Sequence, residues 1–240
     1  MSELGVVGTA LETALLLLPV LGGLLLPEIV RSVPEHVASG PLPEGEPEPP
    51  TYAEVAAMPG LRLLGAVLGA LASVVVAVCV APGWAWGYLL PVTPLLVALA
   101  VIDARTRLLP TRLVLPATGL VLVVAGVEAL VSDTGPPVRA VITLVVVRSL
   151  FWVLWRVRSA GLGFGDVRLS ALVGLMLGRV GLIATGVGVY LPFLLLGLPG
   201  LVLALARRDR SLLRRAYPFG PFLVLGVYLG LVAHLADTMP

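Results

Sequence analysis

Two aspartates stand at the edges of apolar runs, where a carboxyl group is costly unless it is paired or used. Asp166 follows alternating glycines in GLGFGDVRLSALVG (161–174), and Asp103 lies in IDARTRLLP (102–110). Taken singly, each acid is also explained as a helix cap or as the ion-pair partner of a neighbouring arginine. The elements that position the two acids therefore decide whether they act together.

Two carboxyl groups within hydrogen-bonding reach can hydrolyse a peptide, because they share one proton instead of both ionising. The ionised member takes a proton from water while the other polarises the peptide carbonyl, without any metal or cofactor. Asp103 closes an apolar run, where the negative end of a helix dipole disfavours ionisation, whereas Asp166 opens one. We expect Asp103 to hold the shared proton and Asp166 to be the base, as a preference between coupled microstates. A neutron structure with the proton on Asp166 would contradict this assignment.

The composition is that of an all-α membrane protein. The 240 residues are 58% hydrophobic and 12% charged, and the mean hydropathy is +1.05. Such a chain cannot bury its apolar side chains in a water-soluble domain. No basic patch is interleaved with aromatic residues, so nucleic acid is not an expected partner. The single cysteine, Cys79, excludes an internal disulfide and a cysteine-rich zinc site within this sequence, and we predict no metal site.

Apolar runs of bilayer length predict a bundle of about eight transmembrane helices. The expected spans are 4–26, 61–81, 84–102, 111–131, 138–156, 167–183, 185–206 and 217–236. With the N-terminus outside, thirteen arginines fall on the cytoplasmic side: Arg31, Arg62, Arg105, Arg107, Arg112, Arg156, Arg158, Arg168, Arg207, Arg208, Arg210, Arg214 and Arg215. This bias follows the positive-inside rule and places both aspartates at the cytoplasmic boundary.

Three parts are expected along the chain. Residues 1–26 form a first transmembrane helix, which fits better than a cleaved signal peptide because it lacks a basic start. Residues 27–60 form an acidic, proline-rich cytoplasmic loop, in which PLPEGEPEPP (41–50) is expected to be disordered or extended. Residues 61–240 form the transmembrane core that carries both aspartates.

The segments around the two acids resemble those of prepilin peptidases (type IV leader peptidases), a family of GxGD aspartic proteases. GFGDVRLSALVG resembles the family's GxGDxK segment, and IDARTRLLPTRLVLP resembles its first-aspartate segment. YPFGPFLVLG (217–226) is similar to its PxGP-type stretch before the last helix. The resemblance covers about residues 60–236 and implies a multi-pass protein of the bacterial inner membrane. It would cleave the short basic leader of prepilins or pseudopilins at the cytoplasmic face.

The resemblance also implies residue roles. Asp103 and Asp166 correspond to the catalytic pair, and Gly163, Gly165 and Arg168 are expected on the substrate side of the site. Gly161 belongs to the same glycine series, which leaves room for a peptide backbone. Pro218, Gly220 and Pro221 correspond to structural support. Arg168 departs from the family's usual lysine, which keeps the charge but changes its shape.

The sequence further resembles a short form of the family. Many long members carry a zinc-binding domain with paired CxxC motifs and methylate the new N-terminus. The corresponding loop here has no cysteine, so we expect cleavage without that zinc site and do not expect methyltransferase activity. The substrate, the pilus system and the oligomeric state are left open.

Three rival functions remain at this stage. A small transporter could relay protons through its carboxylates, although that predicts acids near the bilayer midplane. A presenilin-type protease would carry YD and PAL segments, and a noncatalytic assembly scaffold would not need both aspartates. Separately, Arg148 lies within an apolar run, so we expect it to face the bundle interior, with Glu12 or Glu128 as its partner.

Overall fold

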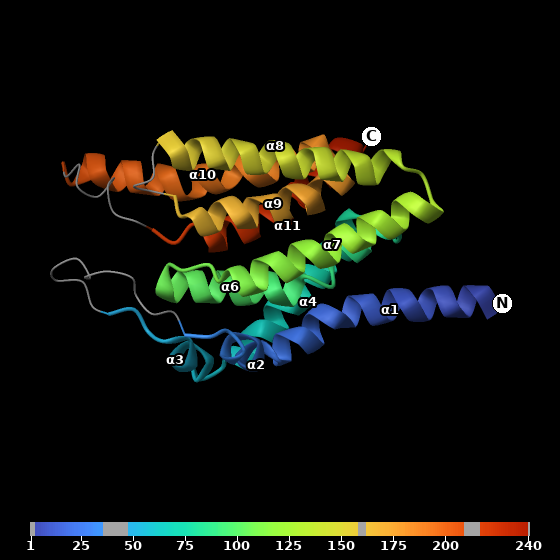
Figure 1. Cartoon of the computed structure of the whole chain (residues 1–240), viewed down its shortest axis with the longest axis horizontal. Coiled ribbons are helices and arrows are strands. Elements are labelled where there is room, and N and C mark those ends of the chain that lie inside the picture. The colour runs from blue at the N-terminus through green and yellow to red at the C-terminus, as the bar shows by residue number, and fades with distance from the viewer. Residues whose placement is uncertain (1–2, 36–47, 158–161, 209–216, 240) are drawn as a thin grey trace.

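The computed structural model describes residues 3–35, 48–157, 162–208 and 217–239, and within these ranges the chain is built from helices without a strand (Figure 1). The predicted all-α membrane bundle is confirmed. The helices are α1 (Glu3–Leu24), α2 (Leu26–Arg31), α3 (Tyr52–Ala56), α4 (Leu61–Cys79), α5 (Trp84–Leu89), α6 (Thr93–Thr106), α7 (Thr111–Val131), α8 (Gly135–Val157), α9 (Phe164–Val180), α10 (Leu182–Ala206) and α11 (Gly220–Thr238).

Six helical segments in the described part of the chain are long and apolar enough to cross a bilayer. They are α4, the α5–α6 unit (Trp84–Thr106), α7, α8, the Leu182–Pro199 part of α10, and α11. Two others are shorter: the apolar part of α1 covers Gly8–Leu24, and α9 has 17 residues. The membrane bundle is therefore confirmed, while the count of eight spans stays a prediction.

The span expected over residues 84–102 is interrupted and ends later than predicted. Helix α5 ends at Leu89 and α6 begins at Thr93. Pro91 lies within the break and Pro94 in the first turn of α6, and proline supplies no backbone N–H to continue a helix. The hydroxyl of Thr93 bridges the gap by donating to the carbonyl of Leu89 at 2.9 Å. The second half of the span runs on to Thr106, so Asp103 lies inside α6 rather than beyond it.

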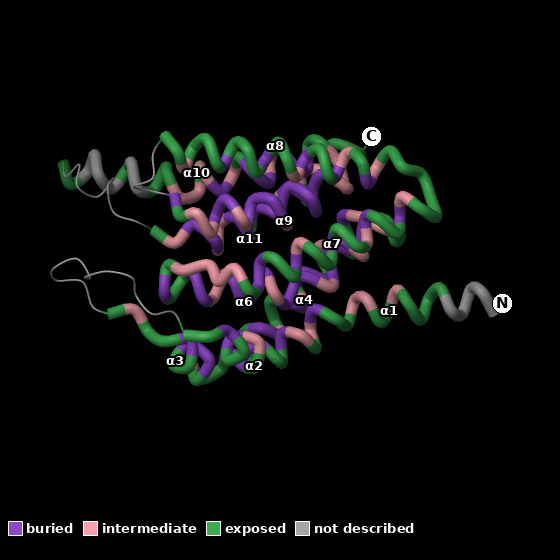
Figure 2. Tube along the Cα trace, in the orientation of Figure 1, coloured by how far each residue is buried: buried purple, intermediate pink, exposed green. Residues whose placement is uncertain are grey.

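Helix α9 lies at the centre of the bundle and is buried along most of its length (Figure 2). It packs against α8, where a Cβ at Gly174 would lie 2.9 Å from the carbonyl oxygen of Thr143. A Cβ at Gly178 would lie 2.6 Å from the Cβ of Thr143. Small residues thus let the two backbones approach closely, as is common between membrane helices.

Arg148 does not face the bundle interior, so that prediction is wrong. Helix α8 turns Thr143, Val147 and Phe151 inward, and these residues recur at the spacing of one helix face. Arg148 follows Val147 by one position, about 100° further round, and is exposed on the outer face. Glu128, suggested as its partner, pairs with Arg179 at 2.7 Å instead.

The segment between the first two long helices folds in part. Helices α2 and α3 pack against each other and against α6. The Glu35 carboxylate joins their ends by accepting the backbone N–H groups of Tyr52 at 2.9 Å and Ala53 at 2.8 Å. Most of the acidic stretch 41–50 lies outside the described residues, and its described positions 48–50 have no regular structure.

Candidate active site

Three helix ends meet at one end of the bundle. We call it the dyad end, after the pair Asp103 and Asp166. Helix α6 finishes there, while α9 and α11 begin there (Figure 1). Helix α11 packs against both α6 and α9 along its length. The side chains in the last turn of α6 and in the first turns of α9 and α11 are therefore brought into one neighbourhood.

Asp103 lies in the last turn of α6 and is only 4% exposed. One carboxylate oxygen, Oδ2, accepts the backbone N–H of Gly220 at 2.8 Å. Gly220 is the first residue of α11, where backbone N–H groups have no partner within the helix. The start of α11 thus fixes the position of the Asp103 carboxylate.

Asp166 lies in the first turn of α9 and is 6% exposed. Its Oδ2 accepts the backbone N–H of Gly163 at 2.9 Å, while its own N–H donates to the Gly163 carbonyl at 3.1 Å. This is the local geometry of a carboxylate that caps a helix N-terminus. Its other oxygen, Oδ1, is buried and has no hydrogen-bond partner among the described residues.

Asp103 and Asp166 are close enough to interact electrostatically. Each carboxylate accepts one backbone N–H, from Gly220 and from Gly163 respectively. These hydrogen bonds alone therefore do not distinguish a proton donor from a base. The two acids differ in the direction of the helix dipole at each, and in the buried Oδ1 of Asp166, which has no partner among the described residues.

The glycines of the motif occupy different environments. A Cβ at Gly165 would lie 2.6 Å from the Cβ of Leu109, so only glycine fits beside the loop that follows α6. Gly163 is exposed, and the nearest atom to a Cβ there would be Oδ2 of Asp166 at 3.3 Å. Gly161, also part of the predicted series, lies outside the described residues.

Arg168 connects α9 to its neighbours. Its Nη1 donates to the hydroxyl of Thr111, the first residue of α7, at 2.6 Å. Its guanidinium carbon lies 4.6 Å from the centre of the Phe164 ring, within the range of a cation–π contact. The half-buried side chain is therefore directed into the protein, where it orients the first turn of α9.

The opposite end of α9 contains a buried charge network that the sequence analysis did not identify. Glu128 is 1% exposed and pairs with Arg179, and it also accepts the hydroxyl of Tyr88 at 2.6 Å. Arg139 donates to the carbonyls of Gly178 and Arg179, each at 2.8 Å. These contacts hold the last turn of α9, so both ends of the Asp166 helix are fixed.

Gly220 is the second feature that sequence reasoning missed. It was expected only as structural support, yet its N–H contacts Asp103 directly. A Cβ on Gly220 would come within 2.9 Å of Asp103 Oδ2. The PFGP stretch was the available signal, since proline is common in the first turn of a helix.

The segment that contains both aspartates matches a known family. Residues 90–205 match the sequence profile of the type IV leader peptidase family. The chain is 34% identical over 174 residues to a prepilin leader peptidase/N-methyltransferase from Aeromonas hydrophila, covering 69% of this chain and 56% of that protein. It is 32% identical over 151 residues to the protein of the same name from Pseudomonas putida, covering 60% of this chain and 49% of that protein.

A third relative matches over a shorter stretch of the chain. The Escherichia coli K12 protein of that name is 34% identical over 139 residues, which cover 55% of this chain and 57% of the relative. The chain thus spans about half the length of the curated relatives it matches. No solved structure matches it.

Proposed function

We propose that the protein is a membrane-embedded aspartic endopeptidase, because residues 90–205 match the sequence profile of the type IV leader peptidase family. Its substrates would be prepilin-like proteins, from which it removes the leader peptide. Asp103 and Asp166 would be the catalytic pair. The chain would cut at the cytoplasmic face of the bacterial inner membrane, as the arginine bias indicates.

One observation carries this proposal: two buried aspartates from separate helices interact at one end of the bundle. Buried carboxyl groups without a cation partner are rare outside functional sites. No Lys, Arg or His in the described part of the chain forms an ion pair with either acid. Among the described residues, the carboxylates accept hydrogen bonds from the N–H groups of Gly163 and Gly220 alone.

The chemistry follows from the positions of the carboxylate oxygens. With one proton shared by the pair, the ionised acid removes a proton from water as the water attacks the peptide carbonyl. The protonated acid donates a hydrogen bond to the carbonyl oxygen. Oδ1 of Asp166 has no partner among the described residues, and we assign it to the water. The backbone N–H groups on the two Oδ2 atoms keep the carboxylates in place during the reaction.

The surrounding residues would position the substrate. The exposed Gly163 leaves a backbone edge beside Asp166 against which an extended peptide can lie. Arg168 would hold the first turn of α9 through Thr111, which makes it a positioning residue rather than a direct peptide contact. The proposal covers cleavage and does not extend to N-methylation, which the relatives' names include, because these 240 residues have one cysteine and hence no CxxC pair.

Co-expression with candidate prepilins tests the proposal. Asp103→Asn and Asp166→Asn each remove the ability to share a proton and to act as acid or base, so cleavage should fall by about 10²–10⁴-fold. Asp237→Asn is the matched control, since this exposed residue lies near the opposite end of α11. Cleavage at the wild-type rate by either dyad variant, with the control also active, would exclude the dyad mechanism.

A further inference from the structure

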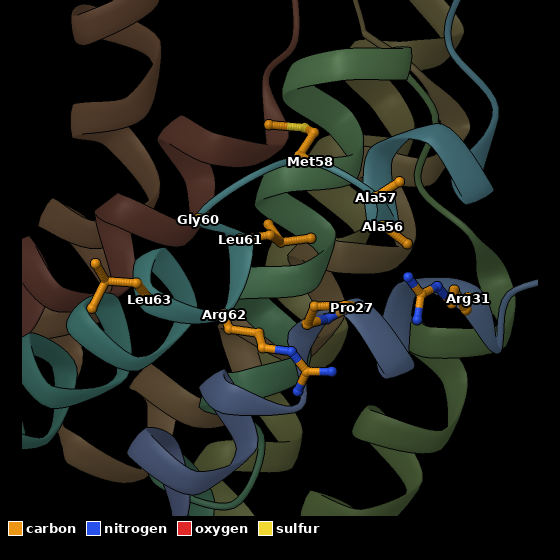
Figure 3. A pocket seen from close by; sticks show the side chains of 9 residues that line it. All are labelled: Pro27, Arg31, Ala56, Ala57, Met58, Gly60, Leu61, Arg62 and Leu63. Atoms are coloured by element: carbon orange, nitrogen blue, oxygen red, sulfur yellow. The ribbon is translucent and has the colours of Figure 1, made fainter.

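A hollow of about 350 Å³ lies beside α2 and α3 and at the start of α4, formed by residues outside the dyad. Its walls include the buried side chains of Pro27, Ala56 and Leu61, which belong to the packed core. Figure 3 shows Arg31 and Arg62 on either side of Pro27. The hollow thus combines an apolar floor with two guanidinium groups.

The two arginines differ in what they already bind. Arg62 donates from Nη1 to the carbonyl of Leu24 at 3.0 Å and forms an ion pair with Glu28. Its guanidinium is thereby held in place and its charge is balanced. Arg31 is exposed and has no hydrogen-bond or ion-pair partner among the described residues. Within the part of the chain that the structure describes, one positive charge at the hollow therefore has no hydrogen-bonded counter-charge.

Two further carboxylates described in this segment, Glu35 and Glu54, are engaged at the start of α3. Glu35 accepts the N–H groups at the start of α3, as described above, and Glu54 accepts the N–H of Thr51 at 2.7 Å. The first turn of α4 lines the hollow as well, beginning after Gly60, which has a φ of +79°. The dipole of this 19-residue helix adds to the preference for an anion.

The position of the hollow matches the boundary of a bilayer. The membrane-crossing stretch of α4 begins at Leu61, in the hollow itself. Leu63, also on the rim, is 68% exposed on the apolar surface of that helix. The rim therefore includes an apolar side chain at Leu63 and a basic side chain at Arg31. These two side chains suit the two parts of a phospholipid, its acyl chain and its phosphate.

We propose that this hollow binds an anionic phospholipid, with the headgroup phosphate against Arg31 and an acyl chain along Leu63. A guanidinium is a good phosphate ligand because it donates planar, charge-assisted hydrogen bonds. A basic peptide segment would be repelled by Arg31, and a free phosphate ion would leave the apolar floor unused. This binding site is independent of the peptidase proposal and uses none of its residues.

The test is lipid retention by the full-length protein in nanodiscs. Protein is reconstituted in phosphatidylcholine with and without phosphatidylglycerol, and retained lipid is counted by native mass spectrometry. We expect wild type to retain phosphatidylglycerol and not phosphatidylcholine. Arg31→Gln should weaken retention about tenfold, as expected for the loss of a charged hydrogen bond. Ala57→Phe, which fills the hollow without changing its charge, should weaken it as well.

Two controls distinguish lipid binding at this hollow from a general effect of positive charge or of misfolding. Arg112→Gln removes the same charge from an exposed arginine in the first turn of α7, outside the hollow, and should retain phosphatidylglycerol as wild type does. Thermal unfolding verifies that all variants are folded. Equal retention by wild type, Arg31→Gln and Ala57→Phe would overturn the site. Retention of both lipids by wild type, or displacement by inorganic phosphate or by a basic leader peptide, would also overturn it.

Discussion

The backbone N–H of Gly220 holds the carboxylate of Asp103 at 2.8 Å across 117 positions of sequence. A Cβ on Gly220 would lie 2.9 Å from Oδ2 of Asp103 and 3.1 Å from the Cβ of Asp103. A methyl group at this position must therefore displace the Asp103 side chain. We expect Gly220→Ala to lower prepilin cleavage by at least about tenfold, since misplaced catalytic groups lose rate steeply.

A second glycine supplies the control for that experiment. Gly119 lies within α7, and a Cβ there would meet nothing within 4 Å. Gly119→Ala should leave cleavage unchanged and raise stability by about 0.5–1 kcal/mol, because alanine favours the helix. If Gly220→Ala cleaved as well as Gly119→Ala, the contact between Gly220 and Asp103 would have no part in the reaction.

The buried pair of Glu128 and Arg179 should contribute strongly to stability. Glu128→Gln leaves the Arg179 guanidinium, one-fifth exposed, without its counter-charge. We expect a loss of about 3–5 kcal/mol, measured as thermal or denaturant unfolding in detergent. The double variant Glu128→Gln/Arg179→Gln should lose less than the sum of the two single variants. If the double variant lost as much stability as the two single variants together, the two side chains would not stabilise each other.

Arg168 offers a test of charge against shape. A lysine at this position can still donate to Thr111 and place its charge over Phe164, although it loses the planar guanidinium. Arg168→Lys should therefore keep cleavage within a few-fold of wild type, whereas Arg168→Ala should lower both cleavage and melting temperature. Single-turnover assays on reconstituted protein measure the first quantity. An alanine variant as active as wild type would show that α9 needs no such anchor.

Arg148 is expected to destabilise the isolated protein in a bilayer. It is exposed on α8, amid the exposed Val145, Val146 and Leu150, and a charge in that environment is costly. Arg148→Leu should raise the melting temperature in nanodiscs and leave cleavage unchanged. Ser149→Leu is a neighbouring control without a charge change. A lower melting temperature for Arg148→Leu would indicate that the arginine has a stabilising contact in the membrane.

Composition and hydropathy were sufficient to predict the helical membrane bundle, because apolar runs of bilayer length have few other folds. They also predicted that Asp166 opens a helix, since glycines precede it and an apolar run follows. The inward face of α8 could not be predicted in the same way. Apolar residues surround Arg148 on every side of that helix, so periodicity does not distinguish its lipid face from its packed face.

Sequence patterns also did not predict the contacts of Glu128 and Asp103, for a different reason. Glu128 could have paired with any buried arginine, and only the packing of α7 on α9 selects Arg179. The bond between Gly220 and Asp103 likewise depends on where α11 lies against α6. Long-range pairings of this kind are set by tertiary packing, which motif spacing does not encode.

The meeting of α6, α9 and α11 also has a consequence for biogenesis. A ribosome that has synthesised the chain through α10 has made both aspartates, but it has not yet supplied the backbone N–H that holds Asp103. If the two aspartates are the catalytic pair proposed above, an inserted intermediate that lacks α11 would therefore be inactive, and synthesis of α11 would complete the site.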